Sequence, residues 1–397
     1  MISLTDFWGN MIYFFIFLLF IFFYPRLIVM QILLALERSA RNLEDMTQKG
    51  KKFVIRKISI KPKKEIVKKI DEFLDFFVIE PVSLDPFGII KKIEHVVTLS
   101  EKRIKAFVAS LAPNLNQEEK ANLMMGLSSA ISLNQVAKIV RHYVELIKKT
   151  KNLQLAMLLQ MQLPQIEKIS KALLKGTEAL VNGWPLGDSI GALAIANLIT
   201  KKGREIEEDT LLVKEKIGKR KVYLIKAKGP GGRLGKLGKA VEKIVKREKI
   251  AKIITVDAAL KLEGEKTGSV AQGVGVAIGG IGVDRAYIEN IATKRKIPLD
   301  SIVIKMSQEE ALIPMKREIL SSIPNVIEKI KESINETKGR GKIIVVGVGN
   351  TCGVGNNRKD AKRAEEQIKK IAKIMEKREK EEKAKEKKSL LDWLSGF

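Results

Sequence analysis

The segment Lys342-Ile-Ile-Val-Val-Gly-Val-Gly-Asn-Thr351 indicates the fold of the second half of the chain. Lys342 to Val346 is a short apolar run rich in β-branched residues, which is typical of a strand buried on both faces. It ends in the glycine turn Gly347 to Thr351. A similar run, Ile253 to Val256, ends at Asp257. Short buried strands with glycines or a carboxylate at their ends indicate an α/β domain.

Strands and helices alternate around these two runs. TLLVKEKI and KVYLIKA are separated by a turn at Gly218, which predicts a β-hairpin. The helical pattern GKAVEKIVKRE and the strand pattern SIVIKM follow along the chain. This alternation predicts a mostly parallel sheet flanked by helices, in an α/β domain over residues 183–357.

The preceding region carries a different periodicity. Residues 65–182 contain helical patterns such as LNQVAKIVRHYVELIKKT and few strand signals, so we expect an all-α domain there. The two histidines, His95 and His142, both fall in it. A lone histidine on a helix is usually structural, and this placement argues against a Ser-His-Asp or Cys-His catalytic set in the α/β domain.

The N-terminal segment predicts a membrane anchor. Trp8 to Tyr24, WGNMIYFFIFLLFIFFY, is a run of 17 residues without a charge. At ~1.5 Å per residue such a helix reaches ~26 Å, close to the ~30 Å core of a bilayer. No Lys or Arg precedes the run and no small-residue cleavage site follows it, which argues against a cleaved signal peptide. We therefore expect residues 1–25 to form a single transmembrane helix.

The flanks of this run predict its orientation. Arg26 to Lys69 holds 13 Lys and Arg against 4 Asp and Glu. The positive-inside rule then places the N-terminus outside and the body in the cytoplasm of the cell. Leu27 to Leu36 is expected to continue along the membrane surface as an amphipathic helix. The basic juxtamembrane segment 26–64 would lie against anionic lipid head groups.

The overall charge leaves several partner classes open. Lys and Arg total 73 against 46 Asp and Glu, a net charge of +27, which suits anionic lipid, nucleic acid or phosphorylated ligands. A Lys/Ile-rich surface of the hyperthermophile type is the alternative explanation. Nucleic acid is not favoured, because aromatic residues are only 6% and no RNA-binding signature appears. The single cysteine, Cys352, excludes an intramolecular disulfide and a multi-cysteine zinc site.

The C-terminal segment 358–397 is predicted to be a charged helix and tail that ends in SLLDWLSGF. It is either a solvated helix or a second contact with the membrane surface. The membrane contact would be made by Leu390, Leu391, Trp393 and Leu394.

The predicted strand ends gather the candidate ligand-binding residues. Ligands of open α/β sheets bind at the carboxyl ends of strands, and glycines let backbone N–H groups approach an anion closely. Lys226, Lys228 and Arg233 would add positive charge to the glycine loop after KVYLIKA, although a tight turn explains glycines at strand ends equally well. No dinucleotide or P-loop fingerprint is present. The candidate binding residues are Gly229, Gly231, Gly232, Arg233, Gly347, Gly349 and Asn350.

Three carboxylates are the candidate chemical groups. Asp257 ends a strand, and Asp188 lies in the turn-rich loop 183–191. Asp284, in GGIGVDR, is the third. Asp188 and Asp284 also precede helical segments, so each can cap a helix instead of binding a ligand.

The long blocks VDAALKLEGEKTGSVAQGVGVAIGGIGVDR and VVGVGNTCGVGN, with the anchor and the helical middle, resemble an uncharacterised archaeal family of membrane-anchored proteins, a domain of unknown function. That resemblance covers nearly the whole chain and implies topology rather than chemistry.

Residues 183–357 also resemble hydrogenase-maturation endopeptidases and spore germination proteases. The shared motifs are GDSIG (187–191), KGPGGRLG (228–235), ITVDA (254–258) and, only at the end, VVGVGN. The motif order matches if the first strand has moved to the C-terminus in a circular permutation. The resemblance implies that Asp188 and Asp257 match the two metal-binding or catalytic carboxylates. The histidine ligand of that family has no counterpart, Asp284 is the nearest acidic substitute, and Ser189 stands where the family keeps glycine.

These features together predict a membrane-anchored cytoplasmic protein with a peptidase-like hydrolase domain. Its catalytic residues would be Asp188 and Asp257, and a divalent metal ion would be held by these two with Asp284. A non-catalytic membrane-bound scaffold, or a protein that binds anions or nucleic acid, is the alternative.

Overall fold

The computed structural model describes residues 4–82, 88–280 and 282–395. As the sequence predicts, a mostly helical N-terminal region precedes an α/β domain. The helical region consists of α1 (Leu4–Ile58), α2 (Lys64–Leu74), α3 (Ile89–Leu111), α4 (Gln117–Thr150) and α5 (Leu153–Asn182).

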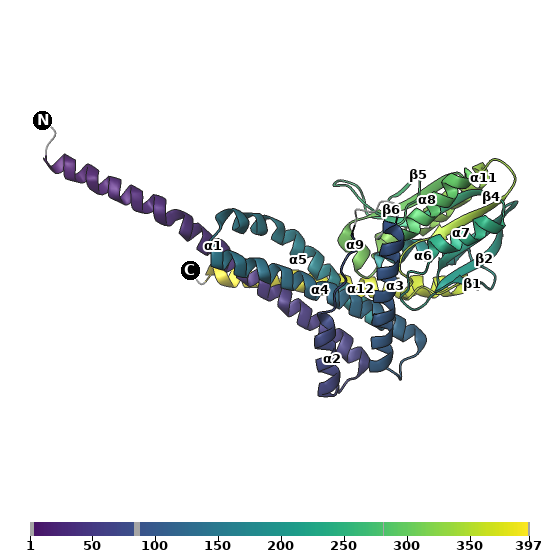
Figure 1. Cartoon of the computed structure of the whole chain (residues 1–397), viewed down its shortest axis with the longest axis horizontal. Helices are drawn as coiled ribbons and strands as arrows, with labels where there is room; N and C mark the ends of the chain where they lie inside the picture. The colour runs from purple at the N-terminus through teal and green to yellow at the C-terminus, as the bar shows by residue number, and fades with distance from the viewer. Residues whose placement is uncertain (1–3, 83–87, 281, 396–397) are drawn as a thin grey trace.

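Helix α1 has two halves with opposite surroundings. From Val29 onward its apolar face is buried against α4 and α5, with Leu36 and Leu43 fully buried. The earlier half projects away from the rest of the molecule (Figure 1). The stretch Leu27–Leu36, expected along the membrane surface, therefore belongs largely to the helical core, because its apolar positions meet the faces of two other helices.

The sheet of the α/β domain is mixed. Its strand order is β1-β2-β3-β7-β4-β6-β5. The central strands β3, β7, β4 and β6 are parallel, whereas β1, β2 and β5 pair antiparallel at the edges. The expectation of a mostly parallel sheet thus holds only for the centre, because tight connections such as the turn at Gly218 (φ 57°) reverse the chain direction. The strands are β1 (Arg204–Glu207), β2 (Thr210–Ile217), β3 (Arg220–Ala227), β4 (Ile250–Leu260), β5 (Val270–Val274), β6 (Leu299–Met306) and β7 (Lys342–Gly347).

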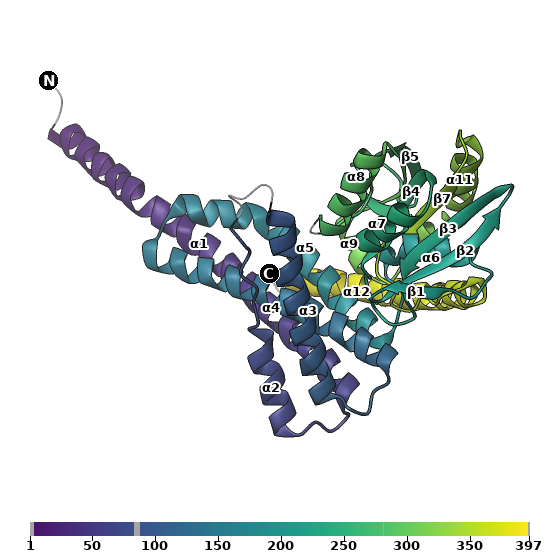
Figure 2. The ribbon, with the colours of Figure 1, turned by 45° about the vertical axis from the view of Figure 1, so that its right-hand side comes forward.

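Helices cover both faces of this sheet. The very apolar helix α6 packs with α11 and α12 on one face, and α7 with α8 on the other. Figure 2 shows α8 and α11 on opposite sides of β4 and β7. The central strands are apolar on both faces for this reason. The remaining elements are η1 (Gly187–Ser189), α6 (Ile190–Leu198), α7 (Leu237–Arg247), α8 (Val283–Arg295), α9 (Gln308–Leu312), α10 (Arg317–Leu320), α11 (Ile323–Glu336) and α12 (Arg358–Ser395).

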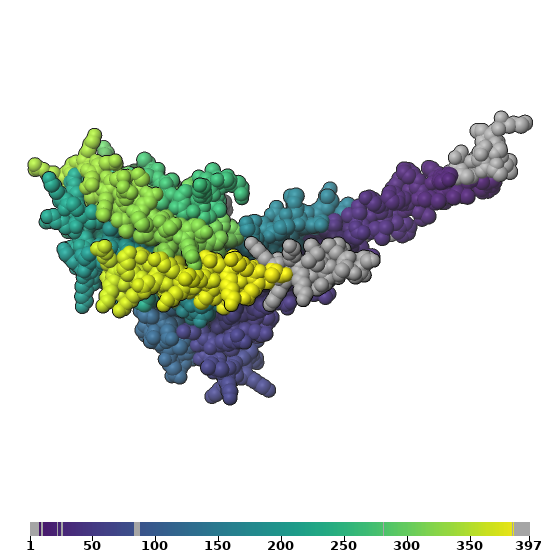
Figure 3. Space-filling view, turned by 180° about the vertical axis from the view of Figure 1, so that it is seen from behind, coloured from purple at the N-terminus to yellow at the C-terminus, as the bar shows by residue number. Residues whose placement is uncertain are grey.

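The C-terminal helix α12 is not a freely solvated tail along its whole length. Ile368 and Ile371 are buried, and Arg378 forms an ion pair with Glu178 of α5 at 3.0 Å. Figure 3 shows α12 in yellow, running along the base of the α/β domain toward the helical region. The side chains of Leu390, Leu391, Trp393 and Leu394 lie outside the described ones.

One helix among the described residues, α4, is long and apolar enough by length and composition to cross a membrane. Its apolar window is 44% buried within the structure, and core helices meet the same criteria of length and composition. Within α1, Met11–Ile21 forms a shorter apolar stretch.

Candidate functional site

The candidate site lies at the carboxyl ends of the two central strands β4 and β7. Asp257 is near the end of β4, opposite Val303 of β6. The segment after β7 stays beside it, because the N–H of Val348 donates to the carbonyl oxygen of Val256 at 2.9 Å. Asp188 arrives from another part of the chain, in η1 at the start of α6. Asp188 and Asp257 thus meet at the strand ends.

Glycines bring Asp188 into this position. A Cβ on Gly191 would lie 2.3 Å from the carbonyl oxygen of Val256 and 2.5 Å from that of Val348. Gly349 adopts φ 106°, and a Cβ there would lie 1.9 Å from the carbonyl oxygen of Asp188. Only glycine allows these backbones to approach so closely. Oδ2 of Asp188 accepts a hydrogen bond from the N–H of Asn350 at 2.8 Å.

The carboxylate of Asp257 is enclosed by backbone N–H groups. Its Oδ1 accepts a hydrogen bond from the N–H of Ala258 at 2.7 Å, and its Oδ2 accepts one from the N–H of Gly279 at 3.0 Å. Gly279 belongs to a glycine-rich segment in which Gly275 and Gly280 have positive φ angles. The side chain of Asp257 is buried under this segment, while Asp188 remains partly exposed.

The two carboxylates influence each other electrostatically. Burial and, to a smaller extent, the negative charge of Asp188 raise the pKa of Asp257 to about 7, against the opposing effect of the N–H groups of Gly279 and Ala258. The pKa of Asp188 is also raised, because the group is surrounded by protein atoms even though it keeps some contact with solvent. The N–H of Asn350 acts in the opposite direction. Two nearby carboxyl groups of this kind titrate as a pair rather than independently.

Asp284 lies apart from this pair. Its Oδ1 accepts a hydrogen bond from the N–H of Gly238 at 2.7 Å, in the first turn of α7. Burial raises the pKa of Asp284, and the charges of Glu94 and Glu101 raise it further. The N–H of Gly238 and the charge of Lys236 lower it. The structure therefore supports the capping alternative for Asp284, except that the capped helix is α7 rather than its own.

The donor set does not fit the expected divalent metal ion. No group of three or more His, Cys, Asp and Glu side chains that could hold a metal is found in the described part of the chain. Both oxygens of Asp257 already accept backbone hydrogen bonds. A hard cation needs several oxygen ligands, and this pair with Asp284 elsewhere does not supply them.

The glycine loop after β3 is occupied by the helical region. The N–H of Gly231 donates to Oε2 of Glu118 at 2.6 Å, and the N–H of Gly232 donates to Oδ1 of Asn122 at 2.7 Å. Arg233 pairs with the same Glu118 at 2.5 Å. The N–H of Gly229 donates to Oδ1 of Asn356. The expected anion-binding loop therefore binds a carboxylate, and that carboxylate comes from α4 of the same chain.

Gly347 and Asn350 lie at the same strand ends as the aspartates. A Cβ on Gly347 would lie 2.5 Å from Cγ1 of Ile195, so this glycine lets α6 pack directly on β7. The side chain of Asn350 accepts a hydrogen bond from the N–H of Cys352 at 2.7 Å, which orders the turn. The buried thiol of Cys352 is inert, because burial raises its pKa to about 12.

Lys226 was expected only to add positive charge to the glycine loop after β3, but the structure places it in the core. Its side chain is fully buried at the end of β3, and its ammonium group donates to the carbonyl oxygen of Ala227 at 2.7 Å and to Oδ1 of Asn356 at 3.3 Å. Burial lowers its pKa to about 7, and the charge of Asp360 opposes this. The only sequence signal was a lysine near the end of a largely apolar strand. That pattern does not show whether the face of the sheet that carries the lysine is covered by other elements.

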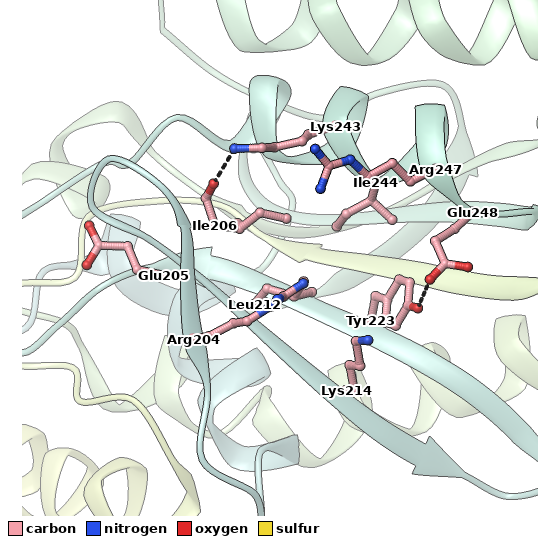
Figure 4. Close-up of a pocket in the computed structure, with 10 residues that line it drawn as sticks. All are labelled: Arg204, Glu205, Ile206, Leu212, Lys214, Tyr223, Lys243, Ile244, Arg247 and Glu248. Atoms are coloured by element: carbon pink, nitrogen blue, oxygen red, sulfur yellow. Dashed lines mark hydrogen bonds between the residues drawn. The ribbon is translucent and has the colours of Figure 1, made fainter.

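Two cavities lie outside the aspartate pair. A groove of about 710 Å³ separates α3 and α4 from the glycine loop, and its lining is mainly apolar, including Val108, Met124 and Leu234. A smaller cleft of about 230 Å³ lies between the β1–β3 edge of the sheet and α7 (Figure 4). Neither cavity is lined by Asp188 or Asp257.

Comparison with known proteins gives a family without an assigned activity. Residues 10–183 match the family model "Protein of unknown function (DUF1512) N-terminal domain". Residues 186–355 match "Domain of unknown function (DUF1512) C-terminal". No curated protein and no solved structure matches the chain. The two matches follow each other and together span most of the sequence, so the chain belongs to the DUF1512 family.

Proposed function

We propose that this protein is a membrane-tethered hydrolase in which Asp188 and Asp257 act as a proton-sharing pair. The observation that carries the proposal is that Asp188 and Asp257 meet at the carboxyl ends of β4 and β7, where burial and the charge of Asp188 raise the pKa of Asp257 to about 7. A carboxyl group that titrates near neutral pH serves both as acid and as base in that pH range. Such perturbed pairs cluster at functional sites.

The two aspartates have distinct tasks in this proposal. The ionised carboxylate accepts a proton from water as that water attacks the substrate, and the protonated carboxyl group donates a proton to the leaving group. The N–H groups of Asn350 and Gly279 keep the two side chains in place. The motifs GDSIG (187–191) and ITVDA (254–258), which resemble those of hydrogenase-maturation endopeptidases and germination proteases, favour an amide bond as the substrate. No step passes through a metal ion, because the donor set lacks further ligands.

Peptide hydrolysis by the full chain in detergent micelles tests this proposal. Fluorogenic peptide libraries are incubated at pH 5 to 9 with the wild type, Asp188→Asn, Asp257→Asn and the exposed control Glu263→Gln. We expect a bell-shaped pH profile, unaffected by a metal chelator, and a loss of about 10²-fold or more in both Asn variants. Absence of hydrolysis throughout, or equal activity in all four proteins, would falsify the hydrolase.

A non-catalytic scaffold is the second candidate, and the glycine loop favours it. Glu118 and Asn122 of α4 take the N–H groups of Gly231 and Gly232, so this loop ties the helical region to the α/β domain. In a scaffold the aspartates serve only to organise the strand ends. Asp257→Asn would then change stability while no substrate is turned over by any variant.

The membrane tether rests on the exposed first half of α1. Side chains on all faces of Met11–Ile21 are exposed, including Tyr13, Phe14, Phe17 and Phe20, on a helix that projects from the body (Figure 1). An exposed apolar surface of this extent is unfavourable in water and favourable in a bilayer. Anionic lipid head groups are the partners that we propose for the basic segment 26–64.

Charges introduced into this stretch test the tether. Phe17→Arg with Phe20→Arg places two guanidinium groups where the bilayer core would lie, at about 2.5–3.5 kcal/mol each. We expect the double variant to leave the alkali-washed membrane fraction. Ile60→Arg, which changes an exposed apolar residue just beyond α1, should remain there with the wild type. A wild type that is extracted by alkali would refute the tether.

A further inference from the structure

The cleft between the strand edge and α7 has an apolar base. Ile206, Leu212 and Ile244 line it together with Tyr223, and its volume is about 230 Å³. The hydroxyl of Tyr223 donates to Oε1 of Glu248 at 2.8 Å, which fixes the ring. Figure 4 shows Lys243 and Arg247 on the α7 side, facing Arg204 and Lys214 on the strand side.

Positive charge dominates this cleft. Arg204, Lys214, Lys243 and Arg247 line it, against Glu205 and Glu248. Both carboxylates are already engaged with lysines that do not line the cleft. Glu205 pairs with Lys228 at 2.9 Å, and Glu248 pairs with Lys342 at 2.5 Å.

The two arginines have no such partners. Lys243 pairs with Glu207 at 2.9 Å, and Lys214 lies 5.6 Å from the ring centroid of Tyr223. Within the described residues, no carboxylate forms an ion pair with Arg204 or Arg247. Two guanidinium groups therefore face a cleft whose own carboxylates are bonded elsewhere. Arginine presents several N–H donors in a fixed plane, a geometry that matches the oxygens of a phosphate.

We infer that this cleft binds a small, soluble phosphate monoester. Arg204 and Arg247 would hold the phosphate, and the organic part would lie against Ile206, Leu212 and Ile244. A dianion matches the excess positive charge better than a single carboxylate does. The volume is below the ~300–1,000 Å³ of pockets for drug-sized ligands, so the ligand is small.

The position of the cleft identifies a soluble ligand rather than a lipid. β1 and β2 lie at the end of the molecule opposite the N-terminal half of α1 (Figure 1). Given the proposed tether, a lipid head group in a bilayer around the first half of α1 would lie on the opposite side of the molecule from the cleft. The cleft shares no residue with the aspartate pair, so this site goes beyond the proposed hydrolysis and stands independently of it.

Calorimetric titration of the full chain in micelles with phenyl phosphate tests this site at physiological salt. We expect saturable binding by the wild type, weakened at least about tenfold in the double variant Arg204→Gln/Arg247→Gln, because charge-assisted hydrogen bonds are lost. Arg103→Gln/Arg295→Gln removes the same charge from exposed positions elsewhere and should bind like the wild type.

Three results would overturn the inference. The first is that the wild type does not bind phenyl phosphate. The second is equal weakening in both double variants, which would mean that only net charge matters. The third is binding to vesicles that contain phosphatidic acid without binding to phenyl phosphate, which would assign the cleft to a lipid head group.

Discussion

The carboxyl group of Asp257 is buried, so its titration makes the stability of the folded protein depend on pH in a defined direction. Its pKa is 3.8 in the unfolded reference and about 7 in the folded protein. Between these values the folded state keeps a proton that the unfolded state has released. The contribution of Asp257 to stability is therefore fully present below pH 3.8 and is lost as the pH rises through 7, by up to about 1.4 kcal/mol per pH unit.

Asp257→Asn removes this titration, so the loss of stability between pH 4 and pH 7 should become smaller than in the wild type. Urea denaturation followed by tryptophan fluorescence at several pH values measures it. Glu263→Gln, at an exposed position with the same change of charge, should follow the wild type. Parallel curves for wild type and Asp257→Asn would show that the aspartate is not titrating in this window.

Lys226 makes the stability of the protein rise with pH, in the range between pH 7 and pH 10.5. Its pKa falls from 10.5 to about 7 on folding, because its ammonium group is buried. Stability from this residue is present above pH 10.5 and is lost as the pH falls toward 7. Lys226→Met should flatten the rise in urea midpoint between pH 7 and pH 10, whereas the exposed Lys221→Met on the same strand should not. An unchanged slope in Lys226→Met contradicts the buried, neutral lysine.

The sequence could predict the positions of Asp188 and Asp257 because strand ends and glycine turns are local signals. Their mutual influence depends on Gly191 and Gly349, which allow η1 to approach β4 and β7 closely. Such contacts join segments more than 150 residues apart, as in the hydrogen bond from Asn350 to Asp188. No local sequence pattern predicts a contact between segments so far apart along the chain. The burial of Lys226 could not be predicted for the same reason.

At the scale of elements, the first turns of α4 act as a clasp on the glycine loop. Asn122 is buried, and its Oδ1 accepts hydrogen bonds from the N–H of Gly232 and from the thiol of Cys352. Asn122→Ala leaves a buried backbone N–H unsatisfied, which costs about 1–3 kcal/mol. We expect faster hydrogen exchange across 229–235 in this variant, measured by mass spectrometry. Asn122→Asp keeps an acceptor and should restore protection, whereas equal exchange in all three proteins excludes the clasp.

Local periodicity predicted the inner strands of the sheet better than the strands at its two ends. The patterns TLLVKEKI and KVYLIKA correspond to β2 and β3, and the central strand β7 begins at Lys342 as expected. β5 (Val270–Val274) was not anticipated, because its sequence VAQGV contains a glycine and lacks a run of β-branched residues. It forms because the edge of β6 offers unpaired backbone groups. The helix α1 also continues through Pro25, where the sequence suggested an end.

At the scale of the whole molecule, the helical region lies between the projecting half of α1 and the α/β domain (Figure 1). α12 adds a second connection, since Lys175 of α5 pairs with Glu379 at 3.3 Å. These contacts tie the α/β domain to the helical region at two places. In the proposed membrane-tethered hydrolase, the side of the membrane on which the body lies would decide which substrates reach Asp188 and Asp257.

The buried state of Cys352 makes this orientation measurable. It is the single cysteine of the chain, it is fully buried, and burial raises its pKa to about 12, so it should not react with maleimides. Lys61→Cys and Glu208→Cys place new thiols at exposed positions of the body, and Trp8→Cys places one at the other end of the apolar run. With a membrane-impermeant maleimide on intact cells, we expect labelling of Trp8→Cys alone, because the excess of basic residues after the run favours a cytoplasmic body. Lysis should then expose Lys61→Cys and Glu208→Cys. Labelling of these two in intact cells would place the body outside the cell and reverse the proposed topology.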